Sequence, residues 1–344
     1  MSSGLYVHIP FCVRKCLYCD FYSGPDMTNK KEYCSALLAE LREYDESFDT
    51  VFIGGGTPTA IGEDLVSLCR ALPKAAEFTV EANPGTLTHG LLRGLREAGV
   101  NRLSLGVQSF NDNELKALGR IHTAAEAEQA FIMAREAGFN NISIDLMLAT
   151  PGQTAESLGR SLKKIAELSP EHVSAYSLIV EEGTPFYENT PPLPSEDEER
   201  ELYWQAVEFL DNIGIKQYEI SNFARPGRES RHNLKYWSGE PYVGIGAAAA
   251  SYHGGYRYRN AADINIYLRG EGRGIDREAV SPSDRLHEKF WLGLRRTAGV
   301  EYNGEFPEAV DRLIKSGLLE MSGSMLRLTR KGLDLANVVF SEFV

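Results

Sequence analysis

The chain has few of the features that mark membrane, secreted or nucleic-acid-binding proteins. No run among its 344 residues approaches the ~20 apolar residues that a membrane helix needs. The N-terminus lacks a charged segment followed by a long apolar stretch, so we expect no secretory signal. Only 36 lysines and arginines stand against 48 aspartates and glutamates, a formal charge of −12, which argues against a nucleic-acid partner. We therefore expect a cytoplasmic protein.

Cysteine is also scarce, and its five residues are unevenly spread. Cys12, Cys16 and Cys19 lie within eight positions and have the spacing C-x3-C-x2-C, directly after a predicted strand. Disulfides within so short a segment suit a chain of this size poorly, whereas metal ligation fits a reducing cytosol. Cys34 and Cys69 fall on predicted helices, where we expect small core residues.

The cysteine spacing predicts an iron–sulfur cluster. Three thiolates in one loop can ligate three irons of a [4Fe–4S] cubane and leave the fourth iron without a protein ligand. An open coordination position is what a substrate-activating metal centre requires. The alternative is structural zinc with His8 or Asp20 as the fourth ligand. Structural zinc usually pairs two C-x2-C units, and the sequence has no second pair.

Strands and helices alternate through the first two-thirds of the chain. β-branched segments predict strands at 5–9, 50–53, 78–81, 102–107, 141–148 and 172–179. Amphipathic patterns predict helices at 30–44, 63–72, 88–98, 111–118, 123–137 and 156–168. This order implies a parallel sheet with right-handed crossovers. Six units predict a partial (β/α)6 barrel of the TIM type, with its chemistry at the carboxyl ends of the strands.

Composition divides the chain into three predicted parts. Residues 1–225 form the partial barrel, which a helix at 196–213 and a strand at 218–223 complete. Residues 226–283 form a junction region rich in glycine, alanine and aromatic residues. Residues 284–344 predict a small α+β domain of three helices, a hairpin turning at 322–324 and a last helix at 331–338, similar to a winged helix. In so acidic a chain we expect this domain to pack as a lid rather than to bind DNA.

Polar residues follow several of the predicted strands. Gly54-Gly55-Gly56-Thr57-Pro58 ends the second strand, and glycine allows the backbone to approach a ligand closely. Glu81, Gln108 and Asp145 belong to the next three strands, where an unpaired buried charge would be costly. Arg120 has the fork geometry that pairs with a carboxylate. Each residue alone also fits a structural ion pair or cap, but together they predict a ligand site at the barrel rim.

Five motifs occur in a fixed order along the chain. They are Tyr6-Val7-His8-Ile9-Pro10-Phe11, the GGGTP segment, Glu81-Ala82-Asn83-Pro84-Gly85, Gly106-Val107-Gln108-Ser109-Phe110, and Asp145-Leu146-Met147 with Pro151-Gly152-Gln153-Thr154. Over nearly its whole length the chain thus resembles the radical S-adenosylmethionine (SAM) group that includes oxygen-independent coproporphyrinogen III oxidases and heme chaperones. The resemblance implies that SAM chelates the open iron and is cleaved by one electron to a 5′-deoxyadenosyl radical. By position it implies SAM contacts at Tyr6, Tyr18, Gly55, Gly56, Thr57, Glu81, Gln108, Arg120 and Asp145.

Three departures favour the chaperone branch over the oxidases. The oxidases have a further cysteine just after the third ligand, whereas Asp20-Phe21 follows Cys19 here. They also have a long segment before the cluster motif, which in this chain begins at residue 12. Finally, the segment from His232 to Trp237 matches the HNxxYW motif that is associated with heme binding in the chaperones. Oxidative decarboxylation of coproporphyrinogen III to protoporphyrinogen IX remains the alternative, and no residue is predicted to be catalytic.

The HNxxYW segment also has a chemical interpretation. Histidine is a common axial ligand of heme iron, and aromatic neighbours can cover a porphyrin face. Without the resemblance, Tyr236 and Trp237 would fit packing at a domain junction, with His232 capping a turn. With it, we predict heme binding at His232, transfer to heme-acceptor proteins, an electron donor for the cluster, and peripheral membrane association only through acceptors. A zinc-dependent regulator that uses the C-terminal domain is the third hypothesis.

Overall fold

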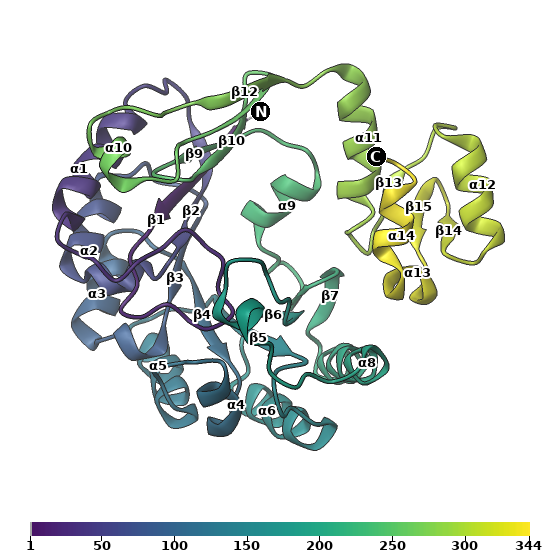
Figure 1. Cartoon of the computed structure of the whole chain (residues 1–344), viewed down its shortest axis with the longest axis horizontal. Helices are drawn as coiled ribbons and strands as arrows, with labels where there is room; N and C mark the ends of the chain where they lie inside the picture. The colour runs from purple at the N-terminus through teal and green to yellow at the C-terminus, as the bar shows by residue number, and fades with distance from the viewer. Residues whose placement is uncertain (1) are drawn as a thin grey trace.

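A large open sheet forms the body of the molecule in the computed structural model, which describes residues 2–344 (Figure 1). Its 12 strands follow the order β12-β11-β10-β9-β1-β2-β3-β4-β5-β6-β8-β7. Six neighbouring parallel strands make its centre: β1 (Ser3–Ile9), β2 (Phe48–Gly55), β3 (Glu77–Ala82), β4 (Arg102–Gln108), β5 (Ile142–Leu148) and β6 (His172–Ser177). The predicted partial (β/α)6 barrel is confirmed.

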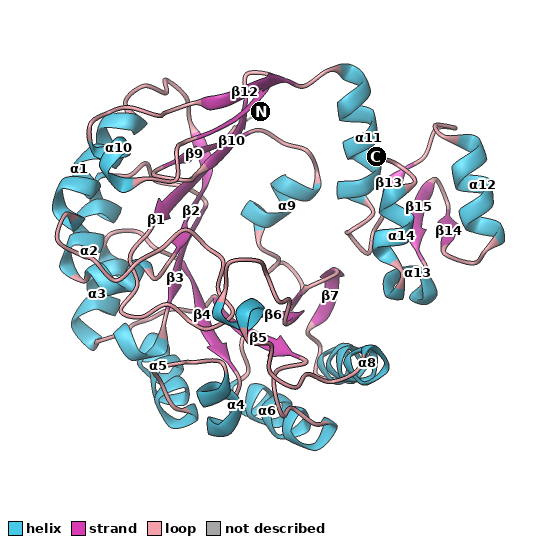
Figure 2. Cartoon of the chain, viewed as in Figure 1, coloured by secondary structure: helices cyan, strands magenta, loops and turns pink. Residues whose placement is uncertain are grey.

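Helices connect these strands and cover the outer face of the sheet (Figure 2). They are α1 (Lys30–Leu41), α2 (Glu63–Ala71), α3 (His89–Glu97), α4 (Asp112–Ala117), α5 (Ala124–Glu136) and α6 (Ala155–Leu168), with short 3₁₀ turns η1 (Pro58–Ile61) and η2 (Pro84–Thr86). Capping boxes at Thr123 and Thr154 begin α5 and α6. Gly99 and Gly138 have φ of 102° and 88° just beyond α3 and α5, which explains why these helices stop there.

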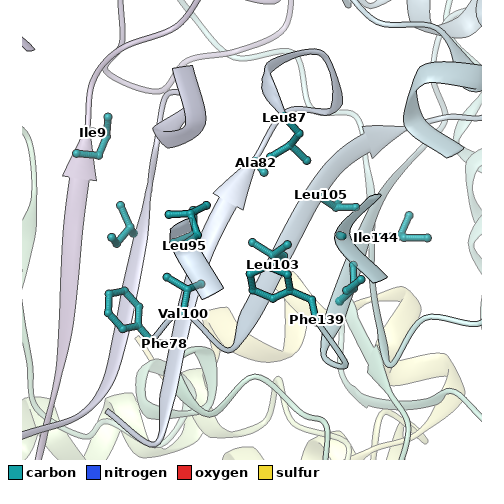
Figure 3. Packing of buried hydrophobic residues seen from close by; sticks show 14 of the residues in the cluster. Ile9, Phe78, Ala82, Leu87, Leu95, Val100, Leu103, Leu105, Phe139 and Ile144 are labelled. Carbon is teal, nitrogen blue, oxygen red and sulfur yellow. The ribbon is translucent and has the colours of Figure 1, made fainter. Parts of the chain in front are cut away.

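Strand alternation determines which side chains of the barrel face the outer helices and which face the interior. Leu5, Val7 and Ile9 of β1 are fully buried against the helices, so Tyr6 and His8 face the interior. Figure 3 shows part of the main core, in which Phe78 and Leu103 from the strands lie near Leu95 of α3. Cys34 and Cys69 belong to this core, as predicted.

The two ends of the sheet differ from the parallel centre. After the short α7 (Pro185–Glu188) and α8 (Glu196–Asn212), the predicted single strand at 218–223 is wrong. The chain instead turns at 220–221 between two short antiparallel strands, β7 (Lys216–Glu219) and β8 (Asn222–Ala224), and β8 runs antiparallel to β6. At the other end, β9 (Tyr242–Ile245) runs parallel to β1, and β10 (Ala250–His253), β11 (Tyr256–Arg259) and β12 (Ile275–Ala279) continue as an antiparallel meander, with α10 (Ile264–Leu268) between the last two.

The short helix α9 (Arg231–Trp237), which contains the HNxxYW motif, lies inside the arc of the sheet (Figure 1). Ser230, rather than His232, caps its N-terminus. The Glu77 carboxylate of β3 accepts hydrogen bonds from the backbone N–H groups of Arg231 and His232, both at 2.9 Å. These bonds fix α9 against the interior face of the barrel because they satisfy N–H groups that a helix leaves open.

The C-terminal segment forms its own small core. Its elements are α11 (Pro282–Gly293), β13 (Val300–Glu301), α12 (Pro307–Lys315), β14 (Leu319–Ser322), β15 (Met325–Leu328), α13 (Arg330–Asp334) and α14 (Ala336–Ser341). The predicted three helices before the hairpin are wrong: two helices flank β13, which pairs with β15. The predicted last helix is divided into α13 and α14 at Leu335. The domain boundaries at 225 and 283 stay a prediction.

Within residues 2–344, no helix has both the length and the apolar character needed to cross a bilayer.

Candidate functional site

One pocket collects most of the predicted site residues at the carboxyl ends of β2 to β6. Its wall includes eleven of the thirteen: Cys12, Cys16, Tyr18, Cys19, Gly55, Gly56, Thr57, Glu81, Gln108, Arg120 and Asp145. Tyr6 and His232 lie outside it. The pocket therefore lies at the end of the barrel where parallel α/β barrels carry their chemistry.

The cysteine loop is held against the glycine-rich segment that ends β2. The backbone N–H groups of Gly56 and Thr57 donate to the carbonyls of Ile9 and Phe11 at 2.8 and 2.7 Å. The Cys12 sulfur lies 3.4 Å from the Thr57 hydroxyl. A side chain at Gly56 would place its Cβ 2.9 Å from that sulfur, so only glycine leaves the space as it is.

The three thiols fit an iron–sulfur cluster. All three are free, and Cys16 and Cys19 are partly exposed to the pocket. Burial raises the pKa of Cys19 to about 11, although a backbone hydrogen bond at Phe21 lowers it in part, so bound metal is what would stabilise a thiolate there. No group of histidine, cysteine or acidic side chains in residues 2–344 is arranged to hold a single ion. A cubane suits the loop because each thiolate binds a different iron.

Two carboxyl groups face the pocket from neighbouring strands. Glu81 accepts a hydrogen bond from the Gly55 N–H at 3.3 Å, and Asp145 accepts one from the Ser104 hydroxyl at 3.0 Å. Burial and then the charge of Asp145 raise the pKa of Glu81 to about 8. Burial also raises the pKa of Asp145. The pair is therefore suited to a positively charged ligand, which would relieve both the burial of the charges and their repulsion.

Gln108 approaches the pocket from the end of β4, and Arg120 approaches it from the segment between α4 and α5. The Arg120 guanidinium donates to the Gly106 carbonyl and, at 3.4 Å, to the Cys16 sulfur. Gln108 has a φ of 68°, a conformation unusual for a residue other than glycine, where the pairing of β4 with β5 shifts. Tyr176, which was not predicted from the sequence, also lines the pocket, and its hydroxyl donates to Gln108 Oε1 at 3.1 Å. Strand alternation along β6 was the signal that could have identified it.

The structure places the two remaining predicted residues in a different environment. Tyr6 lines a second cavity, and its hydroxyl lies 2.9 Å from Nδ1 of His8. His232 is only 1% exposed, with Nδ1 2.8 Å from the Thr50 hydroxyl and Nε2 2.8 Å from the Tyr236 hydroxyl. Burial and then Lys235 lower the pKa of His232 to about 3. Neither ring nitrogen is free in this conformation, so ligation of heme by His232, which stays a prediction, requires one of these bonds to break.

Comparison with known proteins identifies the family. The model of the radical SAM superfamily matches residues 6–165. Heme chaperone HemW of Bacillus subtilis is 41% identical over 98% of both chains, and heme chaperone HemW of Lactococcus lactis is 38% identical over 99% of this chain and 97% of its own. The chain belongs to the HemW family. HemW of Escherichia coli is 34% identical over 99% of this chain and 98% of its own.

The HemW fold also has a relative among solved structures. Coproporphyrinogen III oxidase (HemN) from Escherichia coli, described as a radical SAM enzyme, covers 99% of this chain and 90% of its own with a TM-score of 0.85. At 24% identity, this likeness shows a shared fold and no more. The radical SAM model that matches residues 6–165 implies a [4Fe–4S] cluster and SAM as cofactors, which agrees with the donors of the pocket.

Proposed function

We propose that this HemW-family chain is a heme chaperone that binds heme and transfers it to acceptor proteins. The observation that supports this most directly is the similarity to relatives named heme chaperone HemW, which extends over nearly the whole chain and thus includes α9. We place the protein in the cytoplasm, where cysteines that ligate a cluster stay reduced.

In this proposal the pocket at the barrel rim holds the cluster and SAM. Cys12, Cys16 and Cys19 would bind three irons of the cluster, and a cluster reduced by an electron donor would supply one-electron chemistry for the cleavage of SAM. The backbone carbonyl groups of the glycine-rich segment at 55–57 accept hydrogen bonds from the methionyl ammonium group. Arg120 pairs with the SAM carboxylate.

The carboxylates would complete the recognition of SAM. The charge of Asp145 adds to burial in raising the pKa of Glu81, so a cationic ligand is stabilised there in a way that a neutral ligand is not. Tyr18 and Gln108 line the same wall and complete the proposed contacts. The resemblance also implies a SAM contact at Tyr6, but Tyr6 lines the neighbouring cavity rather than this pocket.

The test is heme transfer by the full chain. Anaerobically reconstituted protein is loaded with hemin and mixed with apomyoglobin, and holo-myoglobin formation is followed by its absorption. We expect transfer faster than from an equal concentration of hemin bound to albumin. The proposal fails if the chain binds no hemin, or if bound hemin leaves no faster than it does from albumin.

Oxidation of coproporphyrinogen III, the activity that the name of HemN gives, is the second candidate, although HemN shares only its fold with this chain. Incubation of the reconstituted protein with coproporphyrinogen III, SAM and dithionite distinguishes the two functions. We expect no protoporphyrinogen IX under conditions in which HemN, run as the positive control, forms it.

A further inference from the structure

Arg120 lies where the cysteine loop, the end of β4 and the rim pocket meet. Its Nη2 donates to the Gly106 carbonyl, and its Nη1 donates to the Cys16 sulfur at 3.4 Å. Its Nε is buried and has no partner within residues 2–344. The guanidinium therefore bonds a strand and a predicted iron ligand with two of its nitrogens, and the third nitrogen is left for another acceptor.

The segment that carries Arg120 is held from two sides. The Leu17 N–H donates to the Leu118 carbonyl at 3.2 Å, which ties the segment to the cysteine loop. Nε2 of the buried His122 lies 3.1 Å from the Val107 carbonyl, which ties the segment to β4. Because the backbone on both sides of Arg120 is fixed, its contact with the cysteine loop does not depend on a bound ligand.

The charge of Arg120 differs in its setting from the other cations of the loop. Arg14 and Lys15 are both exposed, so water and salt screen their charges. The Arg120 guanidinium stays protonated and donates directly to a sulfur, and a hydrogen bond between charged groups is stronger than one between neutral groups. A change of charge at the sulfurs should therefore be felt by Arg120 more than by Arg14 or Lys15.

We propose that Arg120 raises the reduction potential of the cluster through its N–H···S bond to Cys16, while its Nε stays available to the SAM carboxylate. This inference rests on the cluster and SAM site of the proposed function. Reduction adds one electron from a donor of low potential, dithionite in the test, and no covalent bond of Arg120 forms or breaks. Hydrogen bonds to the sulfurs and nearby charge set the potential of such a cluster. The guanidinium stabilises the reduced form more, because that form has one more negative charge.

The experiment is a reductive titration of the anaerobically reconstituted full chain without SAM, followed by electron paramagnetic resonance. At the wild-type midpoint, Arg120→Met should lower the ratio of reduced to oxidised cluster about tenfold, which is ~59 mV for one electron. Arg120→Lys keeps the charge but loses the planar fork, so its ratio should fall less. Lys15→Met is the matched control, because it removes an exposed cation next to Cys16 and should change the ratio less than about twofold.

A second measurement uses the wild-type chain and so does not depend on a variant that binds the cluster. With ¹⁵N-labelled arginine, pulsed paramagnetic resonance of the reduced protein should show a nitrogen coupled to the cluster, because Nη1 contacts a ligating sulfur. Arg120→Lys should lose this coupling. If Arg120→Met takes up no cluster, the wild-type coupling decides the question.

The outcomes separate this inference from the proposed function. An unchanged potential in Arg120→Met, an equal fall in Lys15→Met, or a wild-type cluster without arginine coupling overturns the inference, and heme transfer by the wild type then still supports the chaperone. A coupling that persists in Arg120→Lys also overturns it. Wild type that takes up no cluster overturns this inference together with the proposed cluster site.

Discussion

Gly56 provides a sharp test of how the cysteine loop is held. In Gly56→Ala the new Cβ would lie 2.7 Å from the Phe11 carbonyl oxygen and 2.9 Å from the Cys12 sulfur. Both distances are shorter than a carbon atom tolerates, and the carbonyl belongs to the backbone, so the loop has to move away from β2. Forced overpacking of this kind typically costs about 1–3 kcal/mol. Because Cys12 is one of three thiols on the loop, we expect the displaced loop to bind the cluster more weakly as well as to lower the stability of the fold.

The assay compares iron and acid-labile sulfide per chain after anaerobic reconstitution, together with the free energy of unfolding in urea. Gly24→Ala is the matched control, because Gly24 lies beside the same loop and a Cβ there meets nothing within 4 Å. We expect the control to reconstitute like wild type and Gly56→Ala to lose most of its iron. A Gly56→Ala protein with wild-type iron content and unfolding free energy would refute the reasoning about this contact.

Three further predictions concern other parts of the molecule. The pKa of Glu81 is raised from 4.5 to about 8, so between these pH values the folded apoprotein holds a proton that the unfolded chain has lost. The free energy of unfolding should therefore fall as pH rises through this window. Urea titrations of Glu81→Gln should show a weaker dependence of this free energy on pH. SAM affinity should rise over the same window, and calorimetry that finds the opposite trend would contradict the proposed role of the carboxylates. Arg120→Lys keeps the charge but loses the fork that contacts both the Gly106 carbonyl and Cys16, so SAM should bind about tenfold more weakly by calorimetry. Gly299→Ala would place a Cβ 2.1 Å from the Leu326 carbonyl oxygen, so it should lower the thermal midpoint, whereas Gly304→Ala with open space should lower it much less.

The sequence predicted the parts of the fold that depend on local patterns. Six parallel strands followed from β-branched runs and intervening amphipathic helices. The cysteine spacing and the strand-end residues converge on one pocket because the carboxyl ends of parallel strands meet at one end of a barrel.

What the sequence could not give depends on contacts distant along the chain. The reversal between β7 and β8 is favoured by the pairing of β8 with β6, which no local pattern encodes. His232 was predicted to bind heme, yet its environment is set by Thr50 and Phe52 of β2, which lie 182 and 180 residues away along the chain. Tyr6 faces the interior as alternation requires, but only the position of α9 determines that it meets Tyr236 across a separate cavity.

The central claim is that three cysteines hold a [4Fe–4S] cluster with one iron open to SAM. The most direct measurement is electron paramagnetic resonance of the anaerobically reconstituted, dithionite-reduced chain, with and without SAM. We predict about four irons and four sulfides per chain, and a reduced-cluster signal that changes when SAM is added and is absent from the variant with all three cysteines changed to alanine. A reconstituted protein without acid-labile sulfide, or a cluster signal that SAM leaves unchanged, would contradict the account.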